Sequence, residues 1–236
     1  MPMSRRKTLP PVEELRKRYL ALQGGDIDNS LHVLSEETLL LSLSIKPLRP
    51  GMKIAGPAVT WNAVIASYDP VPRETPQVKA WKKITDCIFP NSVLVYQPGG
   101  EMSSGHLGNL YANMLRARGA QGAVVDGNAR DAAGHLRIAN WSVFCRNSSP
   151  LEAGSRIKWM EPNRPVLMSG ELRRWIEVKP GDFIFGDEDG AIVLPKRLIL
   201  PVLLQAEETR KREEKAEKLY AAGEDPEKVA KKFGAA

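Results

Sequence analysis

The sequence is poor in cysteine, and it lacks long apolar runs. Cys87 and Cys145 are its two cysteines, and no Cys-x-x-Cys pair or Cys/His spacing indicates a zinc site. Two isolated thiols are typical of a reduced, cytoplasmic protein. No apolar run approaches the roughly 18 residues of a membrane helix, and Met1–Thr8 lacks the apolar core of a signal peptide. We therefore expect a cytoplasmic protein with no membrane partner.

Aromatic residues are also scarce, at 6% of the chain. A groove that binds nucleic acid usually combines basic side chains with interleaved aromatic ones. The net charge here is +6, and much of it lies near the two ends of the chain, as in Arg5–Lys7 and Arg16–Arg18. We interpret these residues as solvated faces and expect no nucleic-acid partner.

Enough apolar residues remain for a sizeable core. The hydrophobic content is 42% of 236 residues, which suits one α/β domain with arms. The apolar periodicity and the turn residues predict N-terminal helices over 1–45, an α/β core over 46–200, and a C-terminal helical arm over 201–236. Within the first segment they predict helices over 11–23 and 31–41, with a turn over 26–30.

The stretch from residue 99 to 131 combines glycines, a helix, a strand and a polar loop. Ser103 or Ser104 suits the start of the helix, and Gly119 suits its end. Ala123–Val125 then has the pattern of a short buried strand. Five apolar residues recur at the spacing of one helix face: Leu107, Leu110, Tyr111, Met114 and Leu115.

Two adjacent charged residues follow that strand. The turn signal Asp126-Gly127-Asn128 delivers Arg130 and Asp131 just past the strand's carboxyl end, where open α/β sheets bind ligands. Adjacent residues of a regular strand point to opposite faces, so both side chains reach one site only from a turn or bulge. Arg130 then supplies a fixed cation, and Asp131 supplies a hard oxygen ligand for a divalent cation. The alternative is an ordinary surface ion pair.

Three blocks of sequence, in this order, resemble the RraA-like family. RPGMKIAGPAVTW at Arg49–Trp61 is similar to the family's opening strand, GHLGNLYANMLRARGAQGAVVDGNARD at Gly105–Asp131 to its central signature, and VKPGDFIFGDEDGAIVLP at Val178–Pro195 to its closing strand pair. The family includes the regulator of ribonuclease E activity A. It also includes the 4-hydroxy-4-methyl-2-oxoglutarate/4-carboxy-4-hydroxy-2-oxoadipate aldolases.

The resemblance implies an α/β fold, a β/β/α sandwich of the swivelling-domain type, with an N-terminal helical segment and a long C-terminal helical arm. It also implies a homo-oligomer, a trimer or a hexamer, with sites between subunits. The second half of the predicted C-terminal helix is almost entirely charged, so it has little core to pack on within its own chain. We expect it to lie along a neighbouring subunit.

The aldolase relatives imply a lyase that cleaves a C–C bond of a 4-hydroxy-2-oxo acid, or decarboxylates oxaloacetate, to give pyruvate. The implied cofactor is Mg²⁺, Mn²⁺ or another divalent cation, with Asp131 as its ligand and Arg130 against the enolate or keto oxygen. By the resemblance, Glu213 holds the place from which an aldolase glutamate reaches water on the neighbouring subunit's metal; the alternative is a solvated surface charge. The resemblance also assigns substrate binding to Arg130 and to six consecutive residues: Gly105, His106, Leu107, Gly108, Asn109 and Leu110.

The sequence departs from the aldolases at Asn109, where they usually carry an acid that holds metal-bound water. Asparagine hydrogen-bonds a water but accepts no proton and adds no charge, so a changed substrate and a lost activity are both open. His106 and His135 flank the predicted site, either as proton carriers or as structural histidines. The resemblance makes Glu36 a candidate acid, and the alternative is a solvent-facing helix glutamate. Arg146 is a candidate partner for a distal carboxylate of the ligand, and the alternative is a salt bridge that holds its loop.

Two functions of different classes follow from the resemblance. The first is the lyase. The second is a non-catalytic regulator that binds ribonuclease E or another protein partner. Regulators can keep the Arg-Asp pair but tend to be shorter, so the long charged C-terminal arm favours the lyase.

Overall fold

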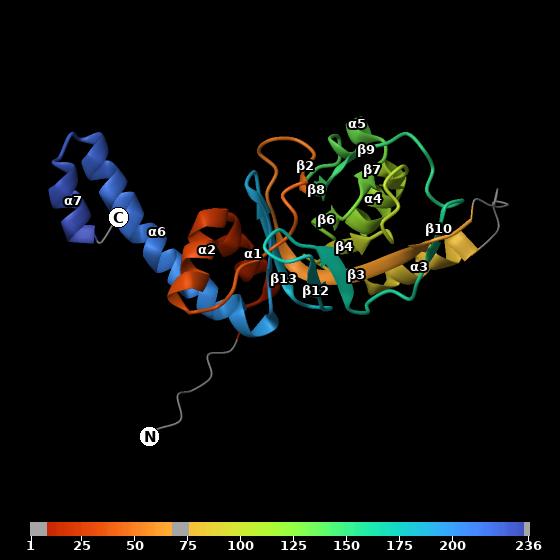
Figure 1. Ribbon diagram of the computed structural model, residues 1–236, viewed down its shortest axis with the longest axis horizontal. Helices are drawn as coiled ribbons and strands as arrows, with labels where there is room; N and C mark the ends of the chain where they lie inside the picture. Colours follow the sequence, from red (N-terminus) through yellow and green to blue (C-terminus); the bar gives the residue numbers. More distant parts are fainter. Residues whose placement is uncertain (1–8, 68–75, 234–236) are drawn as a thin grey trace, which may run out of the picture.

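A computed structural model of the chain describes residues 9–67 and 76–233 (Figure 1). Met1–Thr8, on which the expectation about a signal peptide rests, lies outside the described residues. Within them, nine strands form the main sheet: β1 (Leu39–Leu40), β2 (Lys46–Pro47), β3 (Ile54–Ile65), β4 (Val93–Gln97), β6 (Gly122–Val125), β8 (Ser142–Cys145), β10 (Ile157–Trp159), β13 (Phe183–Asp187) and β14 (Gly190–Leu194). Their order is β1-β14-β13-β3-β4-β6-β8-β2, and β10 pairs with β3.

The middle of this sheet is parallel because helices connect its strands. α3 (Pro76–Cys87) follows β3, α4 (Asn109–Ala117) follows β4, and α5 (Ala132–His135) follows β6. The strands β3, β4, β6 and β8 pair in parallel, as such crossovers require. Their carboxyl ends therefore meet at one edge of the sheet, which is where open α/β sheets bind ligands.

A second, smaller sheet extends this edge. β5 (Gly105–Leu107) precedes α4, β7 (Asn128–Ala129) follows β6, and β9 (Asn147–Ser148) follows β8. In the described residues β7 pairs in parallel with both β5 and β9. The small sheet thus holds side by side the three loops that leave β4, β6 and β8.

Two hydrophobic clusters define the layers of the core. One face of the main sheet packs on α3 and α4 through residues such as Trp81, Ile84 and Leu115. The other face packs on a hairpin of β11 (Val166–Ser169) and β12 (Trp175–Val178). The expected α/β class and the β/β/α layering are confirmed.

The N-terminal helices differ from the sequence prediction. α1 covers Val12–Leu20, as expected, but α2 covers Gly24–Val33, so the turn predicted over 26–30 and the helix predicted over 31–41 are wrong. Gln23 and Asp26 form a reciprocal capping box that satisfies free amides at the start of α2. Ile27 and Leu31, one helical turn apart, are then buried against the end of the sheet. Residues 39–40 form β1 instead of the end of a helix.

The C-terminal arm is helical, as predicted, although its long helix begins two residues early. A 3₁₀ turn, η1 (Lys196–Leu198), leads into α6 (Ile199–Ala221), which is followed by α7 (Pro226–Phe233). Val202, Leu203 and Ala206 in the first half of α6 pack with α1, α2 and the strands β13 and β14. The rest of α6 projects away from the sheet, and α7 folds back beside it (Figure 1). None of the helices in the described residues is both long enough and apolar enough to cross a membrane.

Candidate active site

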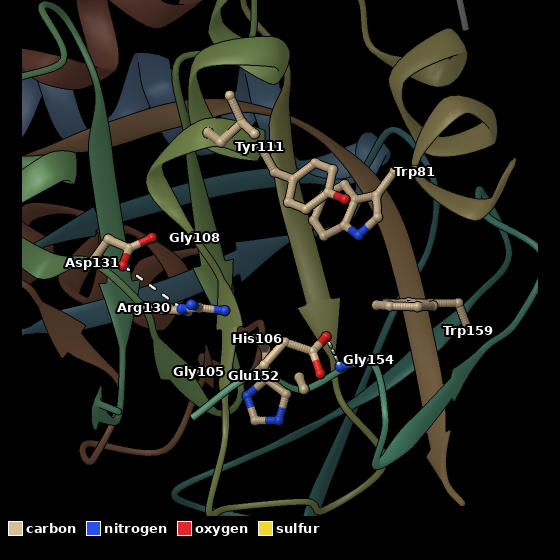
Figure 2. A pocket seen from close by; sticks show the side chains of 12 residues that line it. Trp81, Gly105, His106, Gly108, Tyr111, Arg130, Asp131, Glu152, Gly154 and Trp159 are labelled. Carbon is tan, nitrogen blue, oxygen red and sulfur yellow. Dashed lines mark hydrogen bonds and ion pairs between the residues drawn. The ribbon is translucent and has the colours of Figure 1, made fainter. Parts of the chain in front are cut away.

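The loop after β6 brings two charged side chains to one cavity. The Arg130 amide donates to the Leu107 carbonyl of β5 (2.9 Å), and Asp131 then takes a left-handed backbone with φ 60° and ψ 47°. This turn interrupts the strand alternation, so both side chains line the same cavity, with Arg130 Nε 3.7 Å from Asp131 Oδ1 (Figure 2). Both side chains remain partly exposed, at 39% and 45%. The chain bends at residues 126–127, within the predicted turn, but Asn128 begins β7, and the break that brings both side chains to one cavity lies later, at Asp131.

Two glycines let the backbone of β5 and α4 approach this pair closely. A Cβ on Gly105 would stand 2.6 Å from Arg130 Cβ and 2.5 Å from the Ser149 carbonyl oxygen. A Cβ on Gly108 would stand 3.0 Å from Asp131 Oδ2. Any side chain at residue 105 would push Arg130 or the loop after β9 outward. Glycine at both positions therefore allows the backbone of β5 and the start of α4 to approach the pair closely.

The cavity has a volume of about 380 Å³ and is walled by five segments. The predicted residues that line it are Gly105, His106, Gly108, Leu110, Arg130 and Asp131. The sequence prediction missed Trp81 on α3, Tyr111 as a lining residue on α4, Glu152–Gly154 in the loop after β9, and Trp159 on β10. These side chains come from segments far apart in the chain, so no local pattern links them. The loop of Glu152 lies a few residues after the candidate Arg146, and that candidate is the nearest signal in the sequence.

Two of the predicted substrate-binding residues point elsewhere. Leu107 is fully buried in the core between the sheet and α4, and its carbonyl is engaged by neighbouring groups. The Asn109 side chain packs against Gly134, since a Cβ added to that glycine would lie 2.5 Å from Asn109 Nδ2. The backbone N–H of Asn109, by contrast, faces the site and donates to Asp131 Oδ2 (3.4 Å).

The start and the apolar face of α4 also differ from the prediction. Its N-cap is Gly108, without a side-chain cap, rather than Ser103 or Ser104. Because β5 occupies residues 105–107, the helix begins later than predicted, and its core-facing residues are Ala112 and Leu115. Leu110, expected on the buried face, is 69% exposed.

Three aromatic rings form one wall of the cavity. Trp81 stacks on Tyr111 with ring centroids 3.8 Å apart and planes inclined by 10°. Trp159 meets Trp81 edge-on at 6.3 Å and stacks on Trp61 at 5.8 Å. The indole N–H of Trp159 donates to the Tyr96 hydroxyl (2.8 Å), which fixes the ring. The wall is therefore rigid and presents ring carbon to the cavity.

Glu152 carries the negative charge nearest this wall. Its carboxylate accepts hydrogen bonds from the amides of Gly154 (2.5 Å) and Ser155 (3.1 Å) within its own loop. Figure 2 shows it in the cavity between the aromatic rings and Arg130. Burial and then the charge of Glu152 raise the pKa of the Tyr111 hydroxyl. The cavity thus has an anionic group on each side of Arg130.

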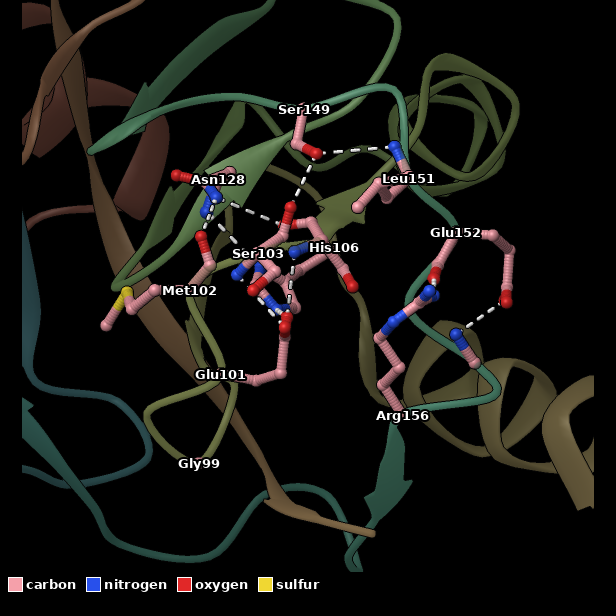
Figure 3. A network of polar contacts seen from close by, with 12 residues as sticks. Gly99, Glu101, Met102, Ser103, His106, Asn128, Ser149, Leu151, Glu152 and Arg156 are labelled. Atoms are coloured by element: carbon pink, nitrogen blue, oxygen red, sulfur yellow. Dashed lines mark hydrogen bonds and ion pairs between the residues drawn. The ribbon is translucent and has the colours of Figure 1, made fainter. Parts of the chain in front are cut away.

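His106 lines the cavity, but both of its ring nitrogens bind protein groups (Figure 3). Nδ1 accepts from the Asn128 amide (3.2 Å), so Nε2 carries the proton and donates to Glu101 (2.9 Å). Burial lowers the pKa of His106 although Glu101 raises it. Burial alone would raise the pKa of Glu101, yet the amides of Ser104 and Ser103 and the His106 ring together lower it.

His135 is bound on both nitrogens as well. Nε2 donates to the Leu107 carbonyl (2.9 Å), and Nδ1 accepts from the Trp141 indole (3.2 Å). The side chain is fully buried, and burial lowers its pKa. Both histidines therefore hold the loops around the site in place, and the geometry favours the structural alternative for them.

Arg146 and Glu36 lie in ion pairs outside the cavity lining. Arg146 binds the fully buried Asp126 through Nη2 (2.6 Å) and Nε (2.8 Å). Glu36 binds Arg197 on the surface, and this pairing lowers the pKa of Glu36. The acidic residues 187–189 lie at the hairpin turn between β13 and β14.

Glu213 lies on α6, which leaves the sheet on the side away from α4 and α5 (Figure 1). Burial, and then the charge of Asp26 in α2, raises its pKa. Within one chain it does not line the cavity described above. Any contribution to a site therefore requires a second subunit.

The donor groups at Asp131 fit a hydrated Mg²⁺ ion rather than a protein cage. In the part of the chain that the structure describes, no three His, Cys, Asp or Glu side chains gather to hold a metal. Asp131 offers a half-exposed carboxylate over an open cavity. Mg²⁺ is commonly bound through one or two carboxylates while it keeps several waters, so a single carboxylate with room around it suits this ion.

Known proteins resemble this chain both in sequence and in fold. DlpA of Legionella pneumophila is 28% identical over 222 residues, which are 94% of this chain and 34% of DlpA, so the chain spans about a third of that relative. A Halalkalibacterium halodurans protein named "Putative 4-hydroxy-4-methyl-2-oxoglutarate aldolase" is 29% identical over 75% of this chain and 77% of its own length. The crystal structure of Streptomyces coelicolor RraAS2, described as an unusual member of the RNase ES inhibitor RraA family, superposes with a TM-score of 0.72 at 24% identity, over 89% of this chain and 99% of that one.

The likeness to RraAS2 shows the fold. The sequence gives the family, since the RraA-like model, described as Aldolase/RraA, matches residues 26–193. This match covers more than half of the chain and includes the main sheet from β1 to β14 and the cavity. The chain is therefore a member of the RraA-like (Aldolase/RraA) family.

Proposed function

We propose that the protein is a divalent-cation-dependent lyase that cleaves a C–C bond of a 4-hydroxy-2-oxo acid and releases pyruvate. The observation that carries this proposal is the left-handed turn at Asp131, which aims a guanidinium and a carboxylate into one cavity. An ordinary surface ion pair would not need a left-handed aspartate, glycines on both sides, and a cavity of this size. The relatives named as aldolases support the same chemistry.

Arg130 and the start of α4 bind the pyruvyl end of the substrate in this proposal. The first amides of a helix have no partner within the helix, and they carry the positive end of its dipole. Those of α4 follow Gly108, which lines the cavity beside Asp131. They seat the substrate carboxylate, and the Arg130 guanidinium faces the keto oxygen, where negative charge develops.

Asp131 would hold the cation through its carboxylate, since Mg²⁺ is commonly bound by one or two carboxylates. A bound divalent cation supplies Lewis-acid stabilisation of the enolate oxygen. The 3.7 Å contact with Arg130 keeps the Asp131 side chain turned into the cavity. Asn109 contributes its backbone amide to the Asp131 carboxylate, so the absence of an acid at this position does not dismantle the pair.

The bonds balance without an oxidant. The C3–C4 bond breaks, its electron pair forms the enolate of pyruvate, and the 4-hydroxyl loses its proton as C4 becomes a carbonyl. C3 then takes a proton. In oxaloacetate the same bond breaks without loss of a hydroxyl proton: C4 leaves as CO₂, the electron pair forms the enolate, and C3 takes a proton. The buried rings of His106 and His135 take no part, because each already binds two protein groups.

An assay of pyruvate release tests the proposal. The full chain is supplied with oxaloacetate or a 4-hydroxy-2-oxo acid, with Mg²⁺ or with EDTA, and pyruvate is followed with lactate dehydrogenase. We expect turnover with Mg²⁺ and its loss in Asp131→Ala, while Asp189→Ala, an exposed acid in the β13–β14 turn, keeps full activity. Absence of cation-dependent turnover on a broad panel of such acids overturns the lyase function. Micromolar binding to ribonuclease E would then favour the regulator.

A further inference from the structure

We propose that the substrate of this site carries an apolar, planar group, such as an aryl ring, on the fragment that leaves as the aldehyde, and that it carries no second carboxylate there. This inference rests on the proposed lyase function and adds the substrate class. It comes from the wall of the cavity that faces Asp131 and Arg130 (Figure 2).

The wall is made of aromatic rings that are already in place. Trp81 and Tyr111 are stacked at 3.8 Å, and Trp159 meets Trp81 edge-on. Trp81 is 3% exposed, and Trp159 is held by its bond to Tyr96. A ring that enters beside such a wall gains offset or edge-to-face contacts, and the wall loses little conformational freedom when it binds.

The charges along the cavity oppose a second carboxylate. Among the lining residues that the structure describes, Arg130 is the cation, and it lies beside Asp131. The charge next to the aromatic wall is the Glu152 carboxylate, which two amides of its loop hold in position. A ligand whose first carboxylate lies at the start of α4 would bring a second one toward Glu152, where two like charges repel. Glu152 is exposed, so water screens part of this repulsion and leaves a modest penalty.

The arginine that the sequence suggested for a distal carboxylate is engaged elsewhere. Arg146 makes two contacts of 2.6 and 2.8 Å to Asp126, which is 1% exposed. It also donates to the Ser44 hydroxyl. Turning it toward the cavity would leave the Asp126 carboxylate buried without its counter-ion. Arg156, near the same loop, donates to the Glu152 carbonyl (2.7 Å).

These positions order the substrate from end to end. In this proposal the pyruvyl carboxylate lies at the start of α4, the keto oxygen lies at Arg130, and the 4-hydroxyl donates a hydrogen bond to the Glu152 carboxylate. The substituent on C4 lies against the rings. Cleavage breaks C3–C4, passes the hydroxyl proton to the Glu152 carboxylate and releases an aryl aldehyde. The electron pair stays on the pyruvate enolate, which then takes a proton at C3.

Two substrates that differ only in the C4 substituent test the inference. One is 4-hydroxy-2-oxo-4-phenylbutanoate, which gives benzaldehyde and pyruvate. The other is 4-hydroxy-2-oxoglutarate, which gives glyoxylate and pyruvate. We expect kcat/KM with Mg²⁺ to favour the phenyl substrate by about tenfold or more, the range in which one apolar group is discriminated. An equal or higher kcat/KM for the dicarboxylate overturns the inference.

Two variants test whether the aromatic wall and the Glu152 charge cause the preference for the phenyl substrate. Tyr111→Leu removes one ring and should raise KM for the phenyl substrate with little change in kcat. Glu152→Gln removes both the charge and the proton acceptor of the 4-hydroxyl. It should therefore lower kcat for both substrates, while the ratio of their kcat/KM values shifts toward the dicarboxylate. Glu161→Gln, an exposed acid paired with Lys83, is the matched control. Circular dichroism of each variant checks the fold, and unchanged preference in both folded variants counts against the inference.

A binding assay separates this inference from the lyase function. Quenching of tryptophan fluorescence by 2-oxo-4-phenylbutanoate and by 2-oxoglutarate compares the same two end groups without a cleavable bond. If no substrate turns over, the lyase function fails, and this assay decides the ligand class alone. Tighter binding of the phenyl compound supports the inference, and equal or tighter binding of 2-oxoglutarate overturns it.

Discussion

The substitution Gly105→Ala tests whether close backbone approach holds Arg130 in the cavity. The added Cβ would stand 2.5 Å from the Ser149 carbonyl oxygen, 2.6 Å from Arg130 Cβ and 2.9 Å from the Ala129 carbonyl oxygen. Ordinary contact begins near 3.4 Å, so the neighbours must move by 0.5 to 0.9 Å. Two of these atoms are backbone oxygens next to the β5–β7–β9 pairing, which cannot rotate away.

The expected cost appears both in stability and in rate. Overpacking of this kind lowers the free energy of unfolding by about 1–3 kcal/mol, which corresponds to a Tm lower by about 2–12 °C for a chain of this size. A shift of nearly 1 Å at Arg130 should lower kcat/KM for pyruvate release by about 10²-fold.

Thermal unfolding and the coupled pyruvate assay measure the two effects. Gly25→Ala is the matched control, because a Cβ at residue 25 of α2 meets no described atom within 4 Å. Alanine there should be neutral or slightly stabilising, since it is a better helix former. A Gly105→Ala protein with wild-type Tm and wild-type kcat/KM would refute the claim that the close approach of Gly105 to Arg130 and Ser149 holds Arg130 in the cavity.

Three further predictions follow from buried or paired charges. Asp126→Ala leaves Arg146 without its carboxylate and should lower the free energy of unfolding by about 3 kcal/mol in urea titrations; a loss below about 1 kcal/mol contradicts this. Burial holds the pKa of His106 below its unfolded value of 6.5, so the unfolded chain binds the proton first and stability falls as the pH drops below about 6.5. His106→Gln should reduce this loss of stability between about pH 7.5 and 5.5. An unchanged dependence of stability on pH argues against a lowered pKa of His106 as its cause. If α6 reaches a neighbouring site, Glu213→Gln lowers kcat about tenfold or more while the exposed Glu214→Gln does not, and equal rates exclude that role.

Much of the fold could be predicted because its signals are local. The apolar runs of β3, β4 and β6 and the glycine at the end of α4 act over a few residues. The prediction failed where a local signal was ambiguous. Gly24-Gly25 suits a helix end equally well as a start, and the capping box of Gln23 and Asp26 decides for the start.

The site was predictable in part for the same reason. Arg130 and Asp131 are neighbours in the chain, and the turn signal Asp126-Gly127-Asn128 lies just before them. Asn109 and Leu107 belong to the same motif, but their side chains point away from the cavity because β5 ends where α4 begins. The direction of a side chain depends on the exact residue at which an element starts, which is the least certain part of a sequence prediction.

The sequence by itself determined the class of fold, the family resemblance and the paired charges after β6. The tertiary structure decided what faces those charges. Trp81, Tyr111 and Trp159 come from three separate elements and meet only because α3, α4 and β10 pack at one edge of the sheet. Likewise, His106 and Arg146 look reactive in the sequence, and only the folded chain shows that Glu101 and Asp126 engage them. Contacts between residues distant in sequence arise from packing, so they are absent from any local pattern.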